Sequence, residues 1–345
     1  MTDTPKILVN AFQSNKTQTA SDPKTIAMSD GTFLVVYVTQ LGGLPGDGDG
    51  FHIRGQRFDI EGQPIGPEIS FPFNRIVDKR DFDLISLGGN RVAIAVDVEQ
   101  DSADGLCPDL AYRVFDINDD GPVQIDFGAA ISRDGSNIQP VLAGNVGPQG
   151  DDLFFFFISD GGREFVIADG RRDVGETASR LIQPTTNTSF IGSENAEIKA
   201  TTLKSGNVVY LLDRDGSDQG GSSFFFRILD SEFNTLADGE VLLPGSRVFE
   251  PQIASLNGGG FVVSFTADDG DIDVAFQVFD ENGMAKTPVQ TLGIEDVPGA
   301  SNNNETTITA LPDGGFIIFY DKDAGAPQIR GQRFDSAGNS VGDDI

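Results

Sequence analysis

The chain has 345 residues, of which 38% are hydrophobic, with 27 Phe, 42 Gly and no Trp. Its formal net charge of −29 excludes nucleic acid and anionic membranes as expected partners, because such a surface repels them. No apolar run is long enough to cross a bilayer, and residues 1–10 lack the basic and apolar regions of a Sec signal, so neither membrane insertion nor a Sec signal is expected.

Self-similarity along the chain predicts the architecture. The segment IRGQRFDIEGQPIG at residues 53–66 returns as IRGQRFDSAGNSVG at residues 329–342. Related segments ending in a similar turn occur at 111–121, 163–175, 224–234 and 275–284. Successive copies lie roughly 55 residues apart, so we predict six repeated units.

Each unit has the same order of elements along the chain. A short first strand leads through a tight Gly turn into an apolar second strand, such as FLVVYV in the first unit and FIIFY in the last. Apolar residues at consecutive positions indicate a strand covered on both faces. A longer loop leads to a third strand ending in FD, and a turn leads to a fourth strand such as residues 67–71 or 123–127. Four strands per unit are typical of a β-propeller blade.

The predicted fold is therefore all-β: a six-bladed β-propeller with four antiparallel strands per blade, forming a single domain over residues 1–345. The blades are expected at about 22–71, 81–127, 137–183, 195–243, 250–292 and 305–345. The last unit has no fourth strand, and residues 6–12 stand alone before the first unit. We expect residues 6–12 to join the last blade and close the ring, because closure removes exposed sheet edges.

The repeats resemble a tandem propeller-type repeat of large secreted bacterial proteins, namely RTX or hemolysin-type calcium-binding proteins and adhesins. The segments ITALPDGGFIIFY (308–320) and IRGQRFDSAGNSVG (329–342) match its pattern closely, and the first unit matches nearly as well. Tyr37, Phe265 and Tyr320 stand near the place of a Trp in that repeat. The resemblance implies a secreted, extracellular bacterial protein, exported by a type I route, that is a monomer or a domain of a larger chain.

Strand order divides the connections between two rims of the predicted ring. The turns between first and second strands, and between third and fourth strands, are tight and share one rim. The loops between second and third strands, and between consecutive units, are long and polar and share the other rim. Binding residues favour loops on a rigid scaffold, so we expect function on the rim with the long loops.

The long loops after the second strands are acidic, and alternate carboxylates in a Gly-containing loop suit Ca²⁺. The candidate metal ligands are Asp47, Asp49, Asp213, Asp215, Asp269, Asp271, Asp273, Asp321 and Asp323. The alternative is that these residues are solvated turn residues and that the charge serves solubility. Cys107 is the only cysteine, which fits either a reducing compartment or a secreted protein stabilised by metal in place of disulfides.

The sequence offers no catalytic constellation. His52 is the only histidine, and no nucleophile, metalloprotease or phosphate-binding motif is present. The favoured function is an extracellular, calcium-supported binding or adhesion propeller that recognises a glycan or cell-surface polymer. A structural or assembly domain of a larger secreted protein is the first alternative, and a polysaccharide-active hydrolase or lyase is the second.

Overall fold

The computed structural model describes residues 19–40, 51–76, 82–97, 110–118, 121–130, 140–147, 150–159, 164–171, 197–213, 223–231, 234–268, 272–292, 306–323 and 327–342. The chain divides into two compact units. Unit 1 comprises Met1–Ser159 and Ile167–Thr185, and unit 2 comprises Asp160–Val166 and Thr186–Ile345. The described part contains strands and turns, and no helix in it is long and apolar enough to cross a membrane.

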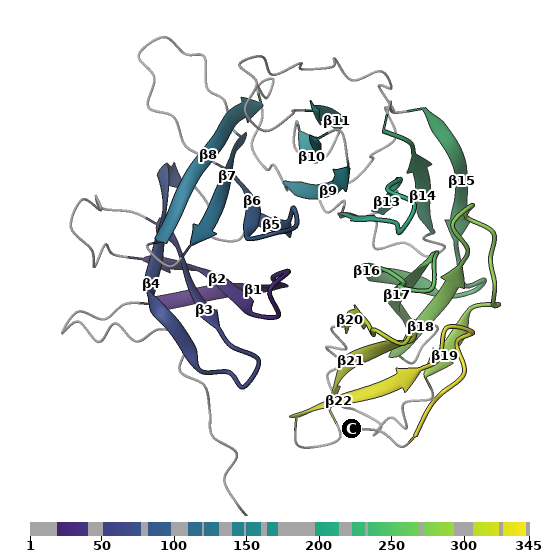
Figure 1. The fold of residues 1–345 in the computed structure, drawn as a ribbon. Helices are drawn as coiled ribbons and strands as arrows, with labels where there is room; N and C mark the ends of the chain where they lie inside the picture. The colour runs from purple at the N-terminus through teal and green to yellow at the C-terminus, as the bar shows by residue number, and fades with distance from the viewer. Residues whose placement is uncertain are drawn as a thin grey trace, which may run out of the picture. The chain divides into compact units, whose positions relative to one another are not determined.

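The strands form antiparallel sheets in simple chain order (Figure 1). Sheet 1 contains β1 (Thr19–Ala27), β2 (Phe33–Gln40), β3 (Phe51–Phe58) and β4 (Pro64–Ile76). Sheet 2 contains β5 (Phe82–Ser86), β6 (Arg91–Asp97), β7 (Leu110–Asn118) and β8 (Gly121–Ala130). Sheet 3 contains β9 (Val141–Gly147), β10 (Gly150–Ser159) and β11 (Glu164–Arg171).

Sheets 4, 5 and 6 follow the same plan. Sheet 4 contains β12 (Ile198–Thr202), β13 (Val208–Asp213), β14 (Phe224–Leu229) and β15 (Thr235–Val241). Sheet 5 contains β16 (Arg247–Ser255), β17 (Phe261–Asp268), β18 (Ile272–Phe279) and β19 (Gln290–Leu292). Sheet 6 contains β20 (Thr306–Ala310), β21 (Phe316–Asp323) and β22 (Pro327–Phe334).

Within each unit, successive sheets stack through their first strands, as the blades of a β-propeller do. In unit 1, β1 lies beside β5, and β5 beside β9; in unit 2, β12 lies beside β16, and β16 beside β20. The all-β, propeller-type prediction is therefore confirmed. The prediction of six four-stranded blades is shown only in part, because sheets 3 and 6 have three strands each in the described part of the chain, and residues 172–183, where the fourth strand of sheet 3 was expected, lie outside it. The closing strand at residues 6–12 lies outside the described residues.

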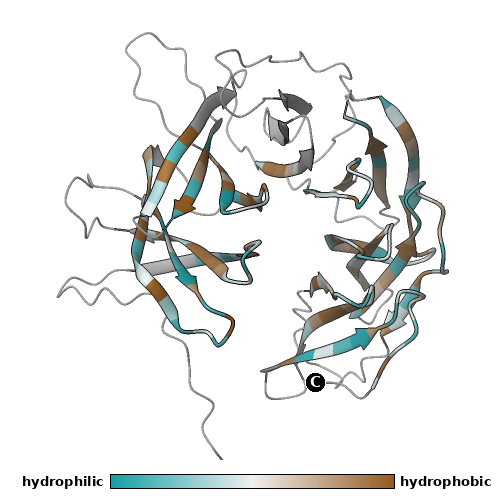
Figure 2. Ribbon diagram, viewed as in Figure 1, coloured by the Kyte–Doolittle hydropathy of each residue, from teal (hydrophilic) through white to brown (hydrophobic). Residues whose placement is uncertain are grey.

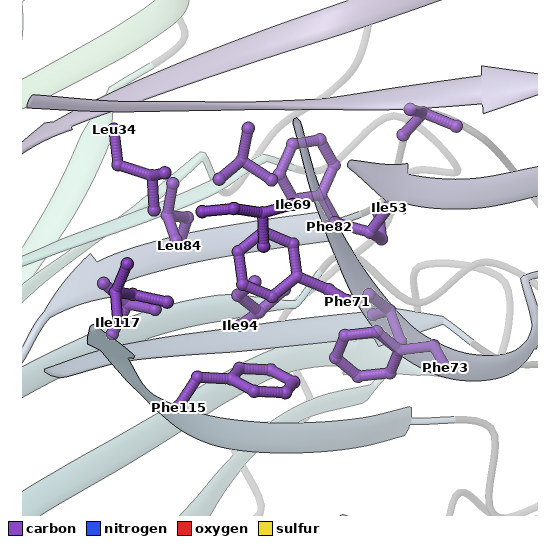
Figure 3. Packing of buried hydrophobic residues seen from close by; sticks show 14 of the residues in the cluster. Leu34, Ile53, Ile69, Phe71, Phe73, Phe82, Leu84, Ile94, Phe115 and Ile117 are labelled. Atoms are coloured by element: carbon purple, nitrogen blue, oxygen red, sulfur yellow. The ribbon is translucent and has the colours of Figure 1, made fainter. Parts of the chain in front are cut away.

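The core between sheets 1 and 2 explains the apolar second strands. Alternate residues of β2 and β6, such as Leu34 and Ile94, point into one cluster together with aromatic residues of the outer strands (Figure 3). Phe71 packs edge-on against Phe115 with ring centroids 5.0 Å apart. The residues between them on β6, such as Ala93, are also buried, so both faces of this second strand are covered, as the sequence predicted.

Unit 2 repeats this packing with more phenylalanine. Phe226 contacts Phe261 and Phe279 at centroid distances of 5.3 and 5.0 Å between sheets 4 and 5. Phe276 contacts Phe316 at 5.5 Å between sheets 5 and 6. Figure 2 shows β14 largely apolar, whereas β22 is largely hydrophilic. The many phenylalanines therefore fill the spaces between consecutive sheets.

The glycine and glutamine of the GQRFD motif have structural roles. A Cβ at Gly331 would lie 2.7 Å from the Phe319 ring on the neighbouring strand, so only glycine leaves room for that ring. The Gln56 side chain is buried, and its Nε2 donates to the carbonyl oxygens of Arg57 and Ile65 at 3.0 and 3.2 Å. The motif therefore recurs because it fixes the third strand to its neighbours.

Candidate functional site

The two rims of each sheet differ in the length of their connections. Neighbouring strands are antiparallel, so first-to-second and third-to-fourth connections share one rim, here called the turn rim. Its described connections are short hydrogen-bonded turns, at 28–32, 59–63, 87–91, 203–207, 256–260, 280–284, 311–315 and 335–339. The opposite rim, here called the loop rim, carries longer connections such as 41–50, 98–109 and 293–305, which lie outside the described residues.

The aspartates of the FD motifs in sheets 1, 5 and 6 cap turns on the turn rim. Asp280 Oδ1 accepts hydrogen bonds from the backbone N–H groups of Asn282 and Met284 at 2.8 and 2.9 Å. Asp335 Oδ1 accepts from Ala337 and Asn339 in the same way, both at 2.9 Å. The glycine three residues after each aspartate has a positive φ, 79° at position 283 and 82° at position 338. These carboxylates are therefore already engaged in hydrogen bonds with backbone N–H groups of their turns.

A second carboxylate on the turn rim pairs with the arginine of the QRFD motif in sheet 1. Asp30 binds the Arg57 guanidinium, and Thr32 Oγ1 accepts from Arg57 Nε at 3.0 Å and donates to Asp30 Oδ1 at 2.6 Å. The hydrogen bond from Thr32 is the main cause of a lowered pKa at Asp30, and Arg57 adds to it. This pair links the third strand to the first-to-second turn.

The same pair occurs in sheet 6. Asp313 binds Arg333, and the Gly315 N–H donates to Asp313 Oδ1 at 3.1 Å. The backbone hydrogen bond from Gly315 and then Arg333 lower the pKa of Asp313. The two pairs differ in exposure: the Arg57 side chain is 10% exposed, whereas that of Arg333 is 44% exposed.

Sheets 4 and 5 lack this pair, and a hollow lies on the turn rim beside them. The positions of Asp30 and Arg57 are taken by Ser205 and Ile228 in sheet 4, and by Gly258 and Val278 in sheet 5. The hollow has a volume of about 580 Å³. We call it the turn-rim hollow, and its lining comes from Lys204, Ser205, Gly258, Gly259, Asp280, Glu281, Asn282 and Lys286.

Both lysines of the turn-rim hollow are held by neighbouring turns. Lys204 Nζ donates to the carbonyl oxygen of Asn257 at 3.0 Å, which links sheets 4 and 5. Lys286 Nζ donates to the carbonyl oxygen of Ser336 at 3.3 Å, which links sheets 5 and 6. Each ammonium keeps further N–H donors for another partner. The hollow therefore presents fixed cationic donors opposite the Glu281 carboxylate and the Asn282 amide.

The predicted metal ligands lie only partly within the described residues. Asp47, Asp49, Asp215, Asp269 and Asp271 lie outside them. Asp213 and Asp323 end β13 and β21, Asp321 lies within β21, and Asp273 lies in β18 opposite Ala267. Expecting these four in loops was wrong, because the strand pairing includes them. No group of three metal-binding side chains occurs among the described residues.

Sequence reasoning missed a recurring acidic residue in the first strands. Asp22 in β1 and Glu250 in β16 lie in equivalent β-bulges of their sheets, and both have a positive φ, 53° and 54° respectively. Each precedes a proline, and Glu197 stands at the matching position before β12. An acidic residue at a constant distance before the Gly turn was the available signal. These residues lie at the loop-rim ends of the first strands.

Two further polar groups of unit 1 are structural. Asp83 accepts from Lys24 Nζ at 3.0 Å and from the Leu142 N–H at 2.8 Å, so it joins the first strands of sheets 1, 2 and 3. Buried Tyr37 donates to Glu68, and burial together with Glu68 raises the pKa of the Tyr37 hydroxyl. His52 lies in β3 and is half-buried.

Comparison with known proteins bears on the fold. No family model and no curated protein matches the chain. An ulvan lyase, described as a new family of polysaccharide lyase, superposes with a TM-score of 0.53 and 12% identity, over 94% of this chain and 84% of that one. The same enzyme bound to -[GlcA(1-4)Rha3S]- gives 0.52 at 12% identity, with the same coverage. A fucose-specific lectin from Aleuria aurantia gives 0.48 at 12% identity, over 92% and 94%. The chain thus shares a fold with the ulvan lyase.

Proposed function

We propose that the chain is an extracellular glycan-binding propeller that recognises a polysaccharide or cell-surface polymer through its loop rim, with support from calcium. The observation that carries the proposal is the asymmetry of the rims. The turn rim is built from short turns whose aspartates are occupied by backbone N–H groups. The loop rim carries the long variable connections, where a rigid scaffold places binding residues.

Calcium support rests on where the acidic residues stand. β6, β13, β17 and β21 each end in an aspartate on the loop rim: Asp97, Asp213, Asp268 and Asp323. Asp22 and Glu250 add carboxylates from the first strands. Ca²⁺ takes six to eight oxygen ligands at about 2.3–2.6 Å, and extracellular modules bind it at about 10⁻⁴–10⁻³ M. We expect this weaker range because the acidic loops have no EF-hand spacing.

The ligand class follows from the fold partner and from the charge. The ulvan lyase of the same fold holds a polysaccharide segment. A net charge of −29 disfavours nucleic acid and anionic lipid surfaces, and leaves hydroxyl-rich polymers as suitable partners. The same proposal includes export by a type I route, as expected for a relative of RTX-type proteins. It also includes closure of sheet 6 by residues 6–12. Sheet 6 supports the closure because, among the described residues, β22 pairs with β21 on one side and with only Ser340 and Val341 on the other.

A glycan array probed with the full chain tests the proposal. We expect binding to at least one polysaccharide in millimolar calcium and loss of that binding in EDTA. The variant D269N/D271N/D273N, which neutralises two aspartates between β17 and β18 and Asp273 near the start of β18, should weaken binding. The control E61Q/D238N/E240Q removes three carboxylates from exposed positions of the third-to-fourth turn of sheet 1 and of β15.

Two results would redirect the proposal. An absence of binding at every calcium concentration would favour the assembly-domain alternative. Release of unsaturated or reducing ends from a bound polysaccharide would favour the lyase or hydrolase alternative. Equal loss of binding in the control variant would show that net charge, and not the loop rim, controls the interaction.

A further inference from the structure

We propose that the turn-rim hollow of unit 2 is a second binding site, which holds an uncharged, hydroxyl-rich saccharide without calcium. The hollow lies on the rim opposite to the one in the proposed function, so this inference does not depend on it. Three observations carry the inference: an unexplained glycine on the floor, fixed polar groups on the walls, and a balanced charge.

Gly258 has no conformational or packing reason to be glycine. The other two glycines of its turn are required: Gly259 has φ +94°, and a Cβ at Gly260 would lie 2.2 Å from the Phe279 carbonyl oxygen. Gly258 has no positive φ, and a Cβ there would meet nothing within 4 Å. In sheets 1 and 6 an aspartate stands at this position. Glycine without a local cause is typical of places where a ligand approaches the backbone closely.

Two of the side chains in the lining of the hollow, Glu281 and Asn282, have no other role in the described structure. Glu281 lies over Gly259, where a Cβ would be 3.1 Å from its Oε1. Among the residues that the structure describes, neither the Glu281 carboxylate nor the Asn282 side-chain amide has a hydrogen-bond partner. Lys204 and Lys286 are fixed by carbonyl oxygens of the neighbouring turns. Side chains that are already held lose little entropy when a ligand binds.

The chemistry of the lining points to neutral hydroxyl groups. A sugar hydroxyl both donates and accepts, so it can donate to Glu281 and accept from a lysine ammonium or from Asn282. Two lysines balance two carboxylates in the lining, which leaves no net charge to attract an ion. The overall charge of −29 disfavours a polyanion. The volume of about 580 Å³ lies within the range of about 300–1,000 Å³ usual for small-ligand sites.

The hollow also differs from the equivalent places in the molecule. In sheets 1 and 6 the Asp–Arg pair joins the first-to-second turn to the third strand. Both sheets that bound the hollow lack both members of that pair. Their replacements, Ile228 and Val278, are buried in the cores between sheets, so they do not extend onto the rim. The site therefore arises from the absence of a stabilising pair, and the turns there are held by the lysines instead.

The experiment measures binding of the full chain to soluble dextran, laminarin and arabinoxylan by affinity electrophoresis in EDTA, with alginate as the polyanionic comparison. We expect retardation by at least one neutral polymer and none by alginate. G258L should place a side chain across the floor and weaken binding about tenfold or more. E281A/N282A should weaken it through lost hydrogen bonds. P312L is the matched control, because Pro312 is an exposed turn-rim residue of sheet 6.

Each outcome decides between the two proposed sites. Binding in EDTA that G258L and E281A/N282A abolish, and that P312L and D269N/D271N/D273N retain, supports the turn-rim hollow. Binding that requires calcium and survives G258L overturns this inference and leaves the loop-rim proposal standing. Retardation by alginate alone overturns the assignment of an uncharged ligand, and no retardation by any neutral polymer in EDTA overturns the site. Thermal melting of G258L and E281A/N282A confirms that both variants are folded before binding is compared.

Discussion

The first-to-second turns of sheets 1 and 6 carry an Asp–Arg pair, whereas those of sheets 4 and 5 carry neither residue. Sheet 2 also lacks both, with Gly89 and Val114 at the two positions. The pair is therefore present or absent as a whole in every sheet where both positions are described. Half a pair is unfavourable, because a partly buried guanidinium without its carboxylate loses hydrogen bonds. The less regular units have thus lost this feature in a coordinated way.

This comparison separates structural from functional residues on the turn rim. Where the pair is present, its carboxylate is committed to an arginine. In sheets 4 and 5, which lack the pair, the turn-rim hollow lies beside Gly258. The pair therefore marks turns that are held by an Asp–Arg interaction, and its absence from two adjacent sheets coincides with the turn-rim hollow.

The largest effect is expected within a single turn of sheet 5. G260A should destabilise the fold by about 3 kcal/mol, because φ is +86° and the new Cβ would lie 2.2 Å from the Phe279 carbonyl oxygen. G258A should leave stability unchanged or raise it by up to about 1 kcal/mol, because its backbone tolerates a side chain. Urea denaturation of both variants measures the difference. Equal destabilisation would mean that Gly258 is required by the turn and would remove the main support for the hollow.

The pair of sheet 1 should show a smaller but clear coupling. In a double-mutant cycle of D30A and R57A, the coupling free energy is expected to be about 1–2 kcal/mol, because Arg57 is largely buried and is held by both Asp30 and Thr32. Chemical denaturation of the four proteins gives the value. Strictly additive effects would contradict the view that the two residues are kept or lost together.

The pair of sheet 6 should couple more weakly. Asp313 and Arg333 have side chains that are 52% and 44% exposed, so solvent screens the pair and its coupling free energy should be smaller than that of the sheet 1 pair. The cycle D313G and R333V converts this turn to the sequence type of sheet 5, and a rise in salt should reduce the coupling further. A coupling larger than that of sheet 1 would show that burial does not determine the strength of these pairs.

The sequence predicted the sheets well because their cause is local. Consecutive apolar residues in FVVSF and FIIFY correspond to β17 and β21, since a strand between two neighbours must be apolar on both faces. Glycines in the FDxxG turns predicted the positive φ of Gly62, Gly283 and Gly338. The number of strands per blade was predicted less well. Sheets 3 and 6 lack a described fourth strand, and whether an edge is covered depends on distant segments of the chain.

The candidate sites were harder to predict for a physical reason. Asp273 and Asp321 were expected in loops, but backbone pairing extends through them, and side-chain type does not reveal where pairing stops. The turn-rim hollow was missed because its floor, Gly258, looks like any turn glycine in the sequence. Only the geometry separates a glycine required by φ or by contact from one with free space above it. The co-occurrence of Asp30 with Arg57, and of Asp313 with Arg333, was a signal that sequence alone contained.

The smallest expected effect concerns the turn that follows the pair of sheet 6. Hydrogen bonds from the Asn339 side chain and from the backbone of the turn lower the pKa of Asp335 below its ordinary value of 3.8. A carboxyl group whose pKa is lower in the folded state contributes stability above its unfolded pKa and loses that contribution as pH falls through the folded pKa. The melting temperature of the wild type should therefore fall more steeply than that of D335N below about pH 4. E61Q, which alters an exposed carboxylate in the corresponding turn of sheet 1, is the control and should follow the wild type. A D335N curve parallel to the wild type would show that this aspartate shapes the turn without linking it to pH.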